Sequence, residues 1–258
     1  MKVRSPSSST LRKRSSSPSS SSGRAKTSEK WTRATVLREL LRLADPKARA
    51  KLAYFGIRAA KAHGISTPAL HALAQRAGKD QDLAEQLWRS GIHEARILAA
   101  LVGEPEKITA AQMERWVRDF DSWDVVDSAC CYLYAGAKPA WKKIYEWSKR
   151  HSEFEKRAAF SLAAYLSYKD KSAADARFEK FLSVIEREAG DERNFVRKAV
   201  NWALRNIGKR NLRLNRAAIQ AAERIRRRDS RSARWIAADA LRELKSEAVQ
   251  ARLRKKAV

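Results

Sequence analysis

The chain has 258 residues, and its 55 Lys plus Arg against 29 Asp plus Glu give a formal net charge of +26. This length can bury a sizeable core, as one large domain or two ordinary ones. The charge far exceeds what solubility demands, and no apolar run approaches the roughly 18 residues of a membrane span, so nucleic acid is a stronger candidate partner than a membrane.

Residues 1–29 consist almost entirely of Ser, Pro, Arg, Lys and Thr. They contain no apolar segment that could serve as a signal-peptide core or anchor a fold, so we expect a disordered basic tail. Its Ser/Arg character fits phosphorylation or nuclear targeting, or simply a solvated tail that attracts phosphate weakly. The first thirty residues hold eight Lys or Arg and one Glu, so +7 of the +26 falls there and +19 remains in the rest.

From residue 30 to 258 the sequence is rich in Ala, Leu, Arg and Glu at helical spacing, with no sustained alternation typical of strands. We therefore predict a single all-α domain. The predicted helices cover 31–43, 46–54, 68–77, 80–89, 92–102, 109–119, 123–135, 138–150, 153–168, 172–189, 192–208, 214–228, 231–244 and 246–256.

Similar segments recur within these helices. Residues 95–100, 196–204 and 233–241 echo one another, and residues 156–162 fit more loosely. Spacings of this order, roughly thirty to forty residues, are typical of a HEAT-like α-solenoid, in which antiparallel helix pairs stack and leave a concave face, here expected to be basic. A right-angled helix bundle is the alternative.

The chemistry-bearing residue types argue against a metal or a cofactor. Cys130 and Cys131 are adjacent, so a bridge between them would be strained, and a reducing compartment is expected. The four histidines lack the spacing of a metal site, so we predict no metal and no cofactor. The expected location is the cytoplasm, in association with the nucleoid, or the nucleus if the source is eukaryotic.

Two aromatic residues fall outside the apolar stripes of their predicted helices. Trp123 and Asp127, four residues apart, stand about 130° from the apolar stripe of theirs, and Trp202 lies at a similar angle among basic residues. Helices of a solenoid contact neighbours on more than one side, so packing could explain either ring alone. Two such rings and a carboxylate together indicate a nucleic-acid site.

Three motifs resemble those of the AlkD-type DNA alkylation repair proteins. They are SWDVVDS at Ser122–Ser128, FEKRAAF at Phe154–Phe160 and KAVNWALRNIGKRN at Lys198–Asn211, and the resemblance runs from about Tyr54 to Leu244. It implies a HEAT-like solenoid that holds duplex DNA. The implied activity is excision of positively charged alkylpurines such as 3-methyladenine and 7-methylguanine by a monofunctional glycosylase, usually a monomer.

The resemblance also implies roles for four residues. Asp127 matches the catalytic carboxylate, Trp123 and Trp202 match the two indoles that flank the deoxyribose of the lesion, and Arg157 matches an arginine that contacts the DNA backbone. One carboxylate would suffice for this chemistry, because a cationic purine leaves as a neutral base and needs no acid. The resemblance further implies that the lesion stays stacked rather than being flipped out.

Further contacts to the DNA backbone are predicted from the basic residues near these motifs. Besides Arg157, the candidates are Lys198, Arg205 and Lys209, followed by the basic cluster at 226–228.

The chain departs from the family pattern at two places. It reads Ser122 where the well-known members carry a second Trp, and the segment 54–57 matches only loosely. Some relatives bind unusual DNA without excising bases. A protein that only binds damaged or branched DNA is therefore the main alternative function, and a protein-interaction scaffold, which would leave the charge unexplained, is the third.

Overall fold

A computed structural model of the chain describes residues 31–256. The basic tail predicted for residues 1–29 lies outside the described residues. Residues 31–256 contain fourteen α-helices and two short 3₁₀ helices, and no strand occurs among them, so the all-α prediction is confirmed. The same residues contain no helix that is long and apolar enough to cross a membrane.

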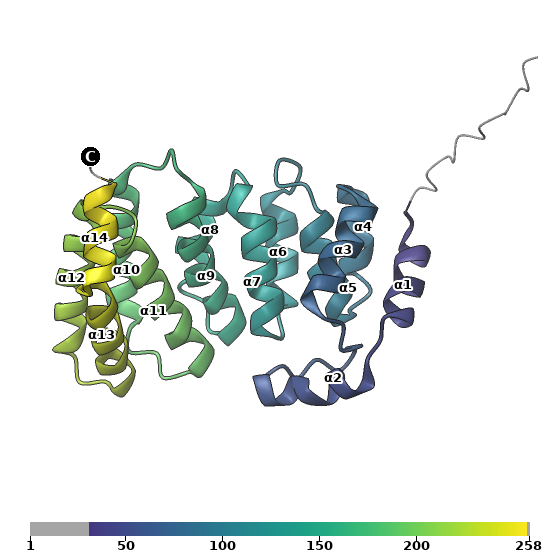
Figure 1. Cartoon of the computed structure of the whole chain (residues 1–258), viewed down its shortest axis with the longest axis horizontal. Coiled ribbons are helices and arrows are strands. Elements are labelled where there is room, and N and C mark those ends of the chain that lie inside the picture. The colour runs from purple at the N-terminus through teal and green to yellow at the C-terminus, as the bar shows by residue number, and fades with distance from the viewer. Residues whose placement is uncertain (1–30, 257–258) are drawn as a thin grey trace, which may run out of the picture. The chain divides into compact units, whose positions relative to one another are not determined.

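The helices follow one another with short connections, in an order that Figure 1 shows. Most begin within a few residues of the predicted boundaries. They are α1 (Arg33–Arg42), α2 (Pro46–Lys51), η1 (Leu52–Phe55), α3 (Thr67–Ala77), α4 (Gln81–Trp88), α5 (His93–Val102), α6 (Ala110–Arg118), α7 (Trp123–Tyr132), η2 (Tyr134–Gly136), α8 (Ala140–Trp147), α9 (Glu153–Lys169), α10 (Asp175–Glu188), α11 (Asn194–Gly208), α12 (Leu212–Arg226), α13 (Arg231–Leu244) and α14 (Glu247–Lys255).

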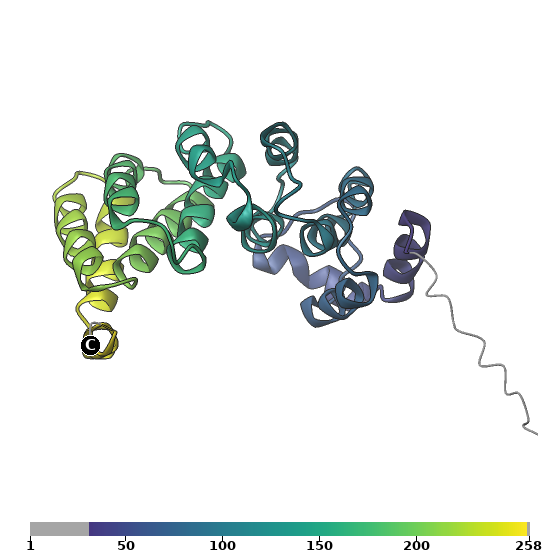
Figure 2. The same cartoon turned by 90° about the horizontal axis from the view of Figure 1, so that it is seen from above.

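The odd-numbered helices from α3 to α13 form one layer, in which each helix packs against the next odd-numbered one. The even-numbered helices from α4 to α14 pack against this layer, which Figure 2 shows in a view turned by 90°. The four echoing sequence segments lie on α5, α9, α11 and α13, all in the odd-numbered layer. The internal repeat therefore corresponds to a repeated position in the array, as expected for a solenoid.

Helix α9 is enclosed on several sides, since it packs against α6, α7, α8 and α11. Its run of small side chains, including Ala158, Ala159, Ala163 and Ala164, is fully or almost fully buried. These small residues let neighbouring helices approach closely. Because helices lie on several sides of α9, its buried residues do not form the one-sided apolar stripe of a surface helix. Polar residues on α9 consequently point into helix interfaces, where they require hydrogen-bond partners.

Indole N–H groups link neighbouring helix pairs through carboxylates. Buried donors of this kind need an acceptor, and a carboxylate about thirty residues away supplies it in each case. The pairs are Trp88 with Asp119 (2.9 Å), Trp116 with Glu85 (3.0 Å), Trp141 with Asp170 (2.9 Å) and Trp147 with Glu114 (3.2 Å).

Two predicted elements differ in extent. The helix predicted for 123–135 ends at Tyr132, because Leu133 leaves the helical conformation (φ −124°, ψ −59°) and a 3₁₀ turn follows. The helix predicted for 46–54 divides into α2 and η1, which ends at Gly56 in the left-handed conformation (φ 75°). That turn brings the chain next to the side chain of Phe195, as described below.

Candidate active site

Asp127 lies on α7, with its side chain partly exposed at 17%. Arg157, on α9, donates from Nη2 to Oδ2 of this carboxylate at 2.7 Å and from Nε to Oδ1 at 3.3 Å. Ser161, one turn further along α9, donates from Oγ to Oδ1 at 2.8 Å. Three hydrogen bonds from one helix therefore fix the orientation of a carboxylate that solvent still reaches.

Arg157 is buried, with 8% of its side chain exposed, and all three guanidinium nitrogens have partners inside the protein. Besides the two contacts to Asp127, Nη1 donates to the backbone oxygen of Phe195, on α11, at 2.9 Å. The guanidinium thus links α7, α9 and α11 at one point. The contact of Arg157 with a DNA phosphate stays a prediction. The observed contacts show that Arg157 positions the Asp127 carboxylate.

Trp123 lies one turn before Asp127 on α7 and is half-buried. Its indole N–H donates to the backbone oxygen of Phe55, in η1, at 2.9 Å. The next residue, Gly56, lies against the Phe195 ring, and a Cβ at Gly56 would stand 2.8 Å from that ring. A glycine is required there by both its positive φ and this close approach. The η1 turn therefore fixes the Trp123 ring and joins α7 to α11.

Trp202, on α11, is half-buried and packs edge to face on Tyr165 of α9, with ring centroids 4.9 Å apart. Burial and the nearby Asp127 carboxylate raise the pKa of Tyr165. Tyr165 lies one turn after Ser161 on α9, so Trp202 packs beside the helix that holds Asp127. Within residues 31–256 the Trp202 indole N–H makes no hydrogen bond, unlike the indoles that link helix pairs through carboxylates.

Three of the four residues expected at the site are directly connected: Trp123 and Asp127 share a face of α7, and Arg157 holds Asp127. Trp202 packs on Tyr165, which follows Ser161 by one turn on α9. A carboxylate offers about four acceptor positions, and three are occupied here, so about one remains for a water molecule. The arrangement presents an oriented anion beside aromatic rings, which suits stabilisation of positive charge.

The other predicted DNA contacts differ in their availability. Lys198 is exposed and forms no ion pair within residues 31–256. Arg205 pairs with Asp239 (3.1 Å) and Glu243 (2.7 Å) of α13, and Lys209 pairs with the same Glu243 (2.6 Å). These two cations already have internal counter-charges, so a DNA phosphate would have to compete with carboxylates for them.

Two of the three arginines in the basic cluster at 226–228 also have partners within the protein. Arg226 pairs with Glu223 at 2.7 Å, and Arg228 donates to backbone oxygens at the end of α10. Arg227 is exposed without an ion pair in the described part of the chain.

The sequence matches the family model described as "DNA alkylation repair enzyme" over residues 36–244. This match covers α3 to α13 and all the residues that contact Asp127. The chain belongs to the DNA alkylation repair enzyme family.

Among solved structures, one with a TM-score of 0.72 shares 18% sequence identity over 86% of this chain and 96% of its own. That protein is described as one of "a new family of proteins related to the HEAT-like repeat DNA glycosylases with affinity for branched DNA structures". The similarity confirms the HEAT-like fold. A designed armadillo repeat protein aligns over 80% of this chain and 98% of its own, with 16% identity and a TM-score of 0.35. No curated protein sequence matches this chain.

Several contacts at the site were missed by sequence reasoning. Ser161 was not among the predicted site residues, although it donates directly to Asp127. The contribution of η1 through the Phe55 carbonyl, and that of Tyr165, were also not predicted. A signal for Ser161 did exist, because it lies four residues after Arg157 and so shares its face of the helix.

Proposed function

We propose that this protein is a monofunctional DNA glycosylase that excises positively charged alkylpurines from duplex DNA. The observation that carries the proposal is the oriented, partly exposed carboxylate of Asp127, held by Arg157 and Ser161 next to Trp123. Membership of the DNA alkylation repair enzyme family supports the same activity class.

The proposed reaction is hydrolysis of the bond between C1′ of the deoxyribose and the ring nitrogen of the alkylated base. The electron pair of this bond moves to the base and cancels its positive charge, so the base leaves neutral without an acid. Asp127 stabilises the positive charge that develops on the sugar. Water then adds to C1′, and its proton passes to the Asp127 carboxylate and on to solvent.

Trp123 and Trp202 contribute without exchanging protons. The face of an indole attracts positive charge with about 0.5–2 kcal/mol in ordinary cation–π settings. Held against the sugar, the two rings would favour the transition state over the uncharged ground state. We propose that the lesion remains stacked in the duplex, so that charge and weakened stacking, instead of the shape of a base pocket, provide recognition.

One alternative has specific support. The solved structure with a TM-score of 0.72 is described as belonging to a family with affinity for branched DNA, and Arg157 here partly neutralises the carboxylate that the glycosylase reaction needs. A protein that binds branched DNA without excision is therefore the second candidate function.

The two candidates predict different outcomes with the same purified protein. Incubation with methylated duplex DNA should release 7-methylguanine if the protein is a glycosylase. Tight binding to three- and four-way junctions with no release of any base would establish the alternative. A matched Asp127→Asn variant identifies the carboxylate as the source of release, since a contaminating glycosylase would be unaffected by it.

A further inference from the structure

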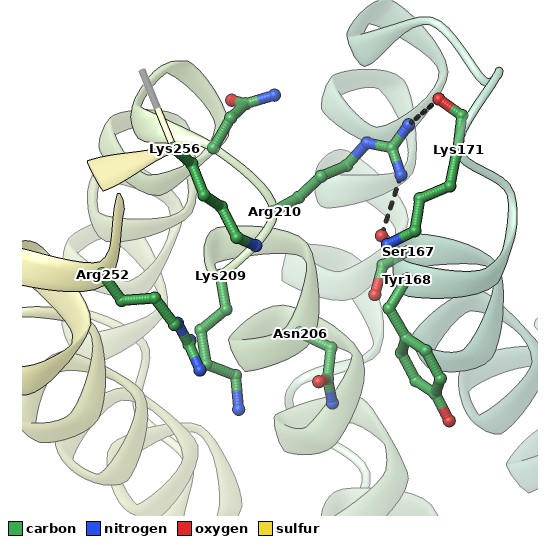
Figure 3. Close-up of a pocket in the computed structure, with 9 residues that line it drawn as sticks. Ser167, Tyr168, Lys171, Asn206, Lys209, Arg210, Arg252 and Lys256 are labelled. Atoms are coloured by element: carbon green, nitrogen blue, oxygen red, sulfur yellow. Dashed lines mark hydrogen bonds between the residues drawn. The ribbon is translucent and has the colours of Figure 1, made fainter. Parts of the chain in front are cut away.

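A cationic pocket lies where α14 meets the C-terminal ends of α9 and α11 (Figure 3). Its volume is about 380 Å³. No Asp or Glu is among the residues that line it, and the lining includes five basic side chains. These are Lys171, Lys209, Arg210, Arg252 and Lys256.

Three of these cations, Lys171, Arg252 and Lys256, form no ion pair within residues 31–256, whereas Lys209 shares Glu243 with a second cation. Figure 3 shows Arg252 of α14 and Lys256, directly after α14, near Lys209, which directly follows α11. Like charges gathered around one cavity repel one another unless an anion occupies it. The charge balance of the pocket therefore favours an anionic ligand.

Arg210 gives the pocket a rigid floor. Its Nη1 donates to the backbone oxygen of Ser167 at 2.9 Å, and its Nη2 donates to those of Lys171 at 3.1 Å and Ala173 at 2.8 Å. With 11% of its side chain exposed and its Nε 3.8 Å from the Asp175 carboxylate, this guanidinium is held in place and part of its charge is balanced. Arg210 therefore contributes a fixed group, while the longer, exposed side chains of Arg252 and Lys256 can adjust around an anion.

Tyr168 adds a neutral hydrogen-bond donor to the rim. Burial, together with the neighbouring Cys131, raises the pKa of Tyr168 to about 12, so its hydroxyl remains protonated at neutral pH. With 41% of its surface exposed, it can donate to a ligand oxygen. A phosphate oxygen accepts hydrogen bonds from hydroxyl and ammonium groups alike.

The pocket continues the surface that carries the candidate active site. Asn206 and Lys209 follow Trp202 by one and two turns on α11, and Tyr168 follows Tyr165 by one turn on α9. Seven residues of helix span about 10 Å, which equals the rise of roughly three base pairs in duplex DNA.

The side chains that α14 contributes to this pocket lie beyond residues 36–244, the segment shared with the family.

We propose that this pocket binds a backbone phosphate of the DNA held at Asp127, about three nucleotides from the base to be excised. The inference rests on the proposed function for the location of the DNA, but the phosphate contact itself does not require excision. It assigns the C-terminal helix α14 to DNA binding, which the family segment alone does not include.

The first experiment measures how DNA affinity depends on salt. The variant K171Q/R252Q/K256Q removes the three exposed, unpaired cations, and K149Q/K180Q/R216Q removes the same charge from the even-numbered helices and the turn after α8. Each phosphate contact contributes about −0.9 to the slope of log K against log salt. We expect the pocket variant to have a slope shallower by about one and an affinity lower by about tenfold, with the control close to wild type. Equal slopes and affinities for the two variants would overturn the proposal.

A second experiment locates the phosphate. Duplexes carrying one uncharged methylphosphonate linkage at successive positions are bound by the wild type and the pocket variant. Neutralising the linkage about three nucleotides from the lesion should weaken the wild type about tenfold and leave the pocket variant unchanged, because both changes remove the same contact. Additive losses at every position would overturn the proposal. Binding is read without base release, so a protein that fails to excise would sink the proposed function and leave this result standing.

Discussion

The Arg157 guanidinium contacts both oxygens of the Asp127 carboxylate, at 2.7 and 3.3 Å, from a neighbouring helix thirty residues along the chain. Since 8% of the Arg157 side chain and 17% of the Asp127 side chain are exposed, solvent reaches the carboxylate more readily than the guanidinium. The pair therefore fixes a carboxylate at the protein surface and keeps one of its edges open.

Ser161→Ala should lower the rate of base release about tenfold and leave KM nearly unchanged. The substitution removes the hydrogen bond to Oδ1 and loosens the orientation of Asp127 without touching DNA. Single-turnover rates at saturating protein measure the effect. Ser148→Ala is the matched control, since it removes another fully buried hydroxyl, which donates to the backbone oxygen of Tyr145 one turn earlier. A similar loss in both variants would mean that packing, and not Asp127 orientation, is responsible.

Trp202→Leu should slow release by about two- to thirtyfold, because the substitution removes a ring with an expected contribution of about 0.5–2 kcal/mol. Trp202→Phe should retain part of the rate. Trp235→Leu serves as control: that indole is 40% exposed on α13 and packs under Arg197. The role assigned to Trp202 would be refuted by equal rates in the Leu variant and the wild type.

Glu243→Gln should strengthen DNA binding. The substitution removes the carboxylate that pairs with Lys209 and one of the two carboxylates that pair with Arg205. Both cations therefore become more available to phosphates. We expect the dependence of affinity on salt to steepen by about one to two units of slope. Glu179→Gln, which releases Arg213 on α12, controls for the change in net charge. If Glu243→Gln binds no better than this control, neither cation contacts DNA.

The His93–Asp124 pair should make stability depend on pH. Burial disfavours the charged imidazole, but the 2.9 Å hydrogen bond to Asp124 and nearby carboxylate charges outweigh it and raise the pKa of His93. A raised pKa gives a stabilisation that is complete below the unfolded value of about 6.5 and disappears as pH rises through the folded value. Asp124→Asn should therefore lower the free energy of unfolding more at about pH 6 than at about pH 9. Urea unfolding at both pH values measures this, and an equal loss at both would contradict it.

Much of the fold could be predicted from the sequence, because short segments separate the predicted helices and similar residue patterns recur within them. Trp123 and Asp127 could be placed together because residues four apart on a helix share a face. The partners of Asp127 could not be predicted, because α9 packs against four other helices and lacks a one-sided apolar stripe from which to judge where Arg157 points. The ion pairs of Arg205 and Lys209 with α13 depend on how consecutive repeats stack, which helical spacing within one segment does not reveal.

Release of 7-methylguanine from methylated duplex DNA, compared between the wild type and Asp127→Asn, tests the central claim most directly. The variant leaves Arg157 without its counter-charge, so its folding is checked first by thermal unfolding. We predict release by the wild type, a rate at least about 100-fold lower in the variant, and no release of a neutral adduct such as ethenoadenine by either. Release at the same rate by a folded Asp127→Asn protein would contradict the account.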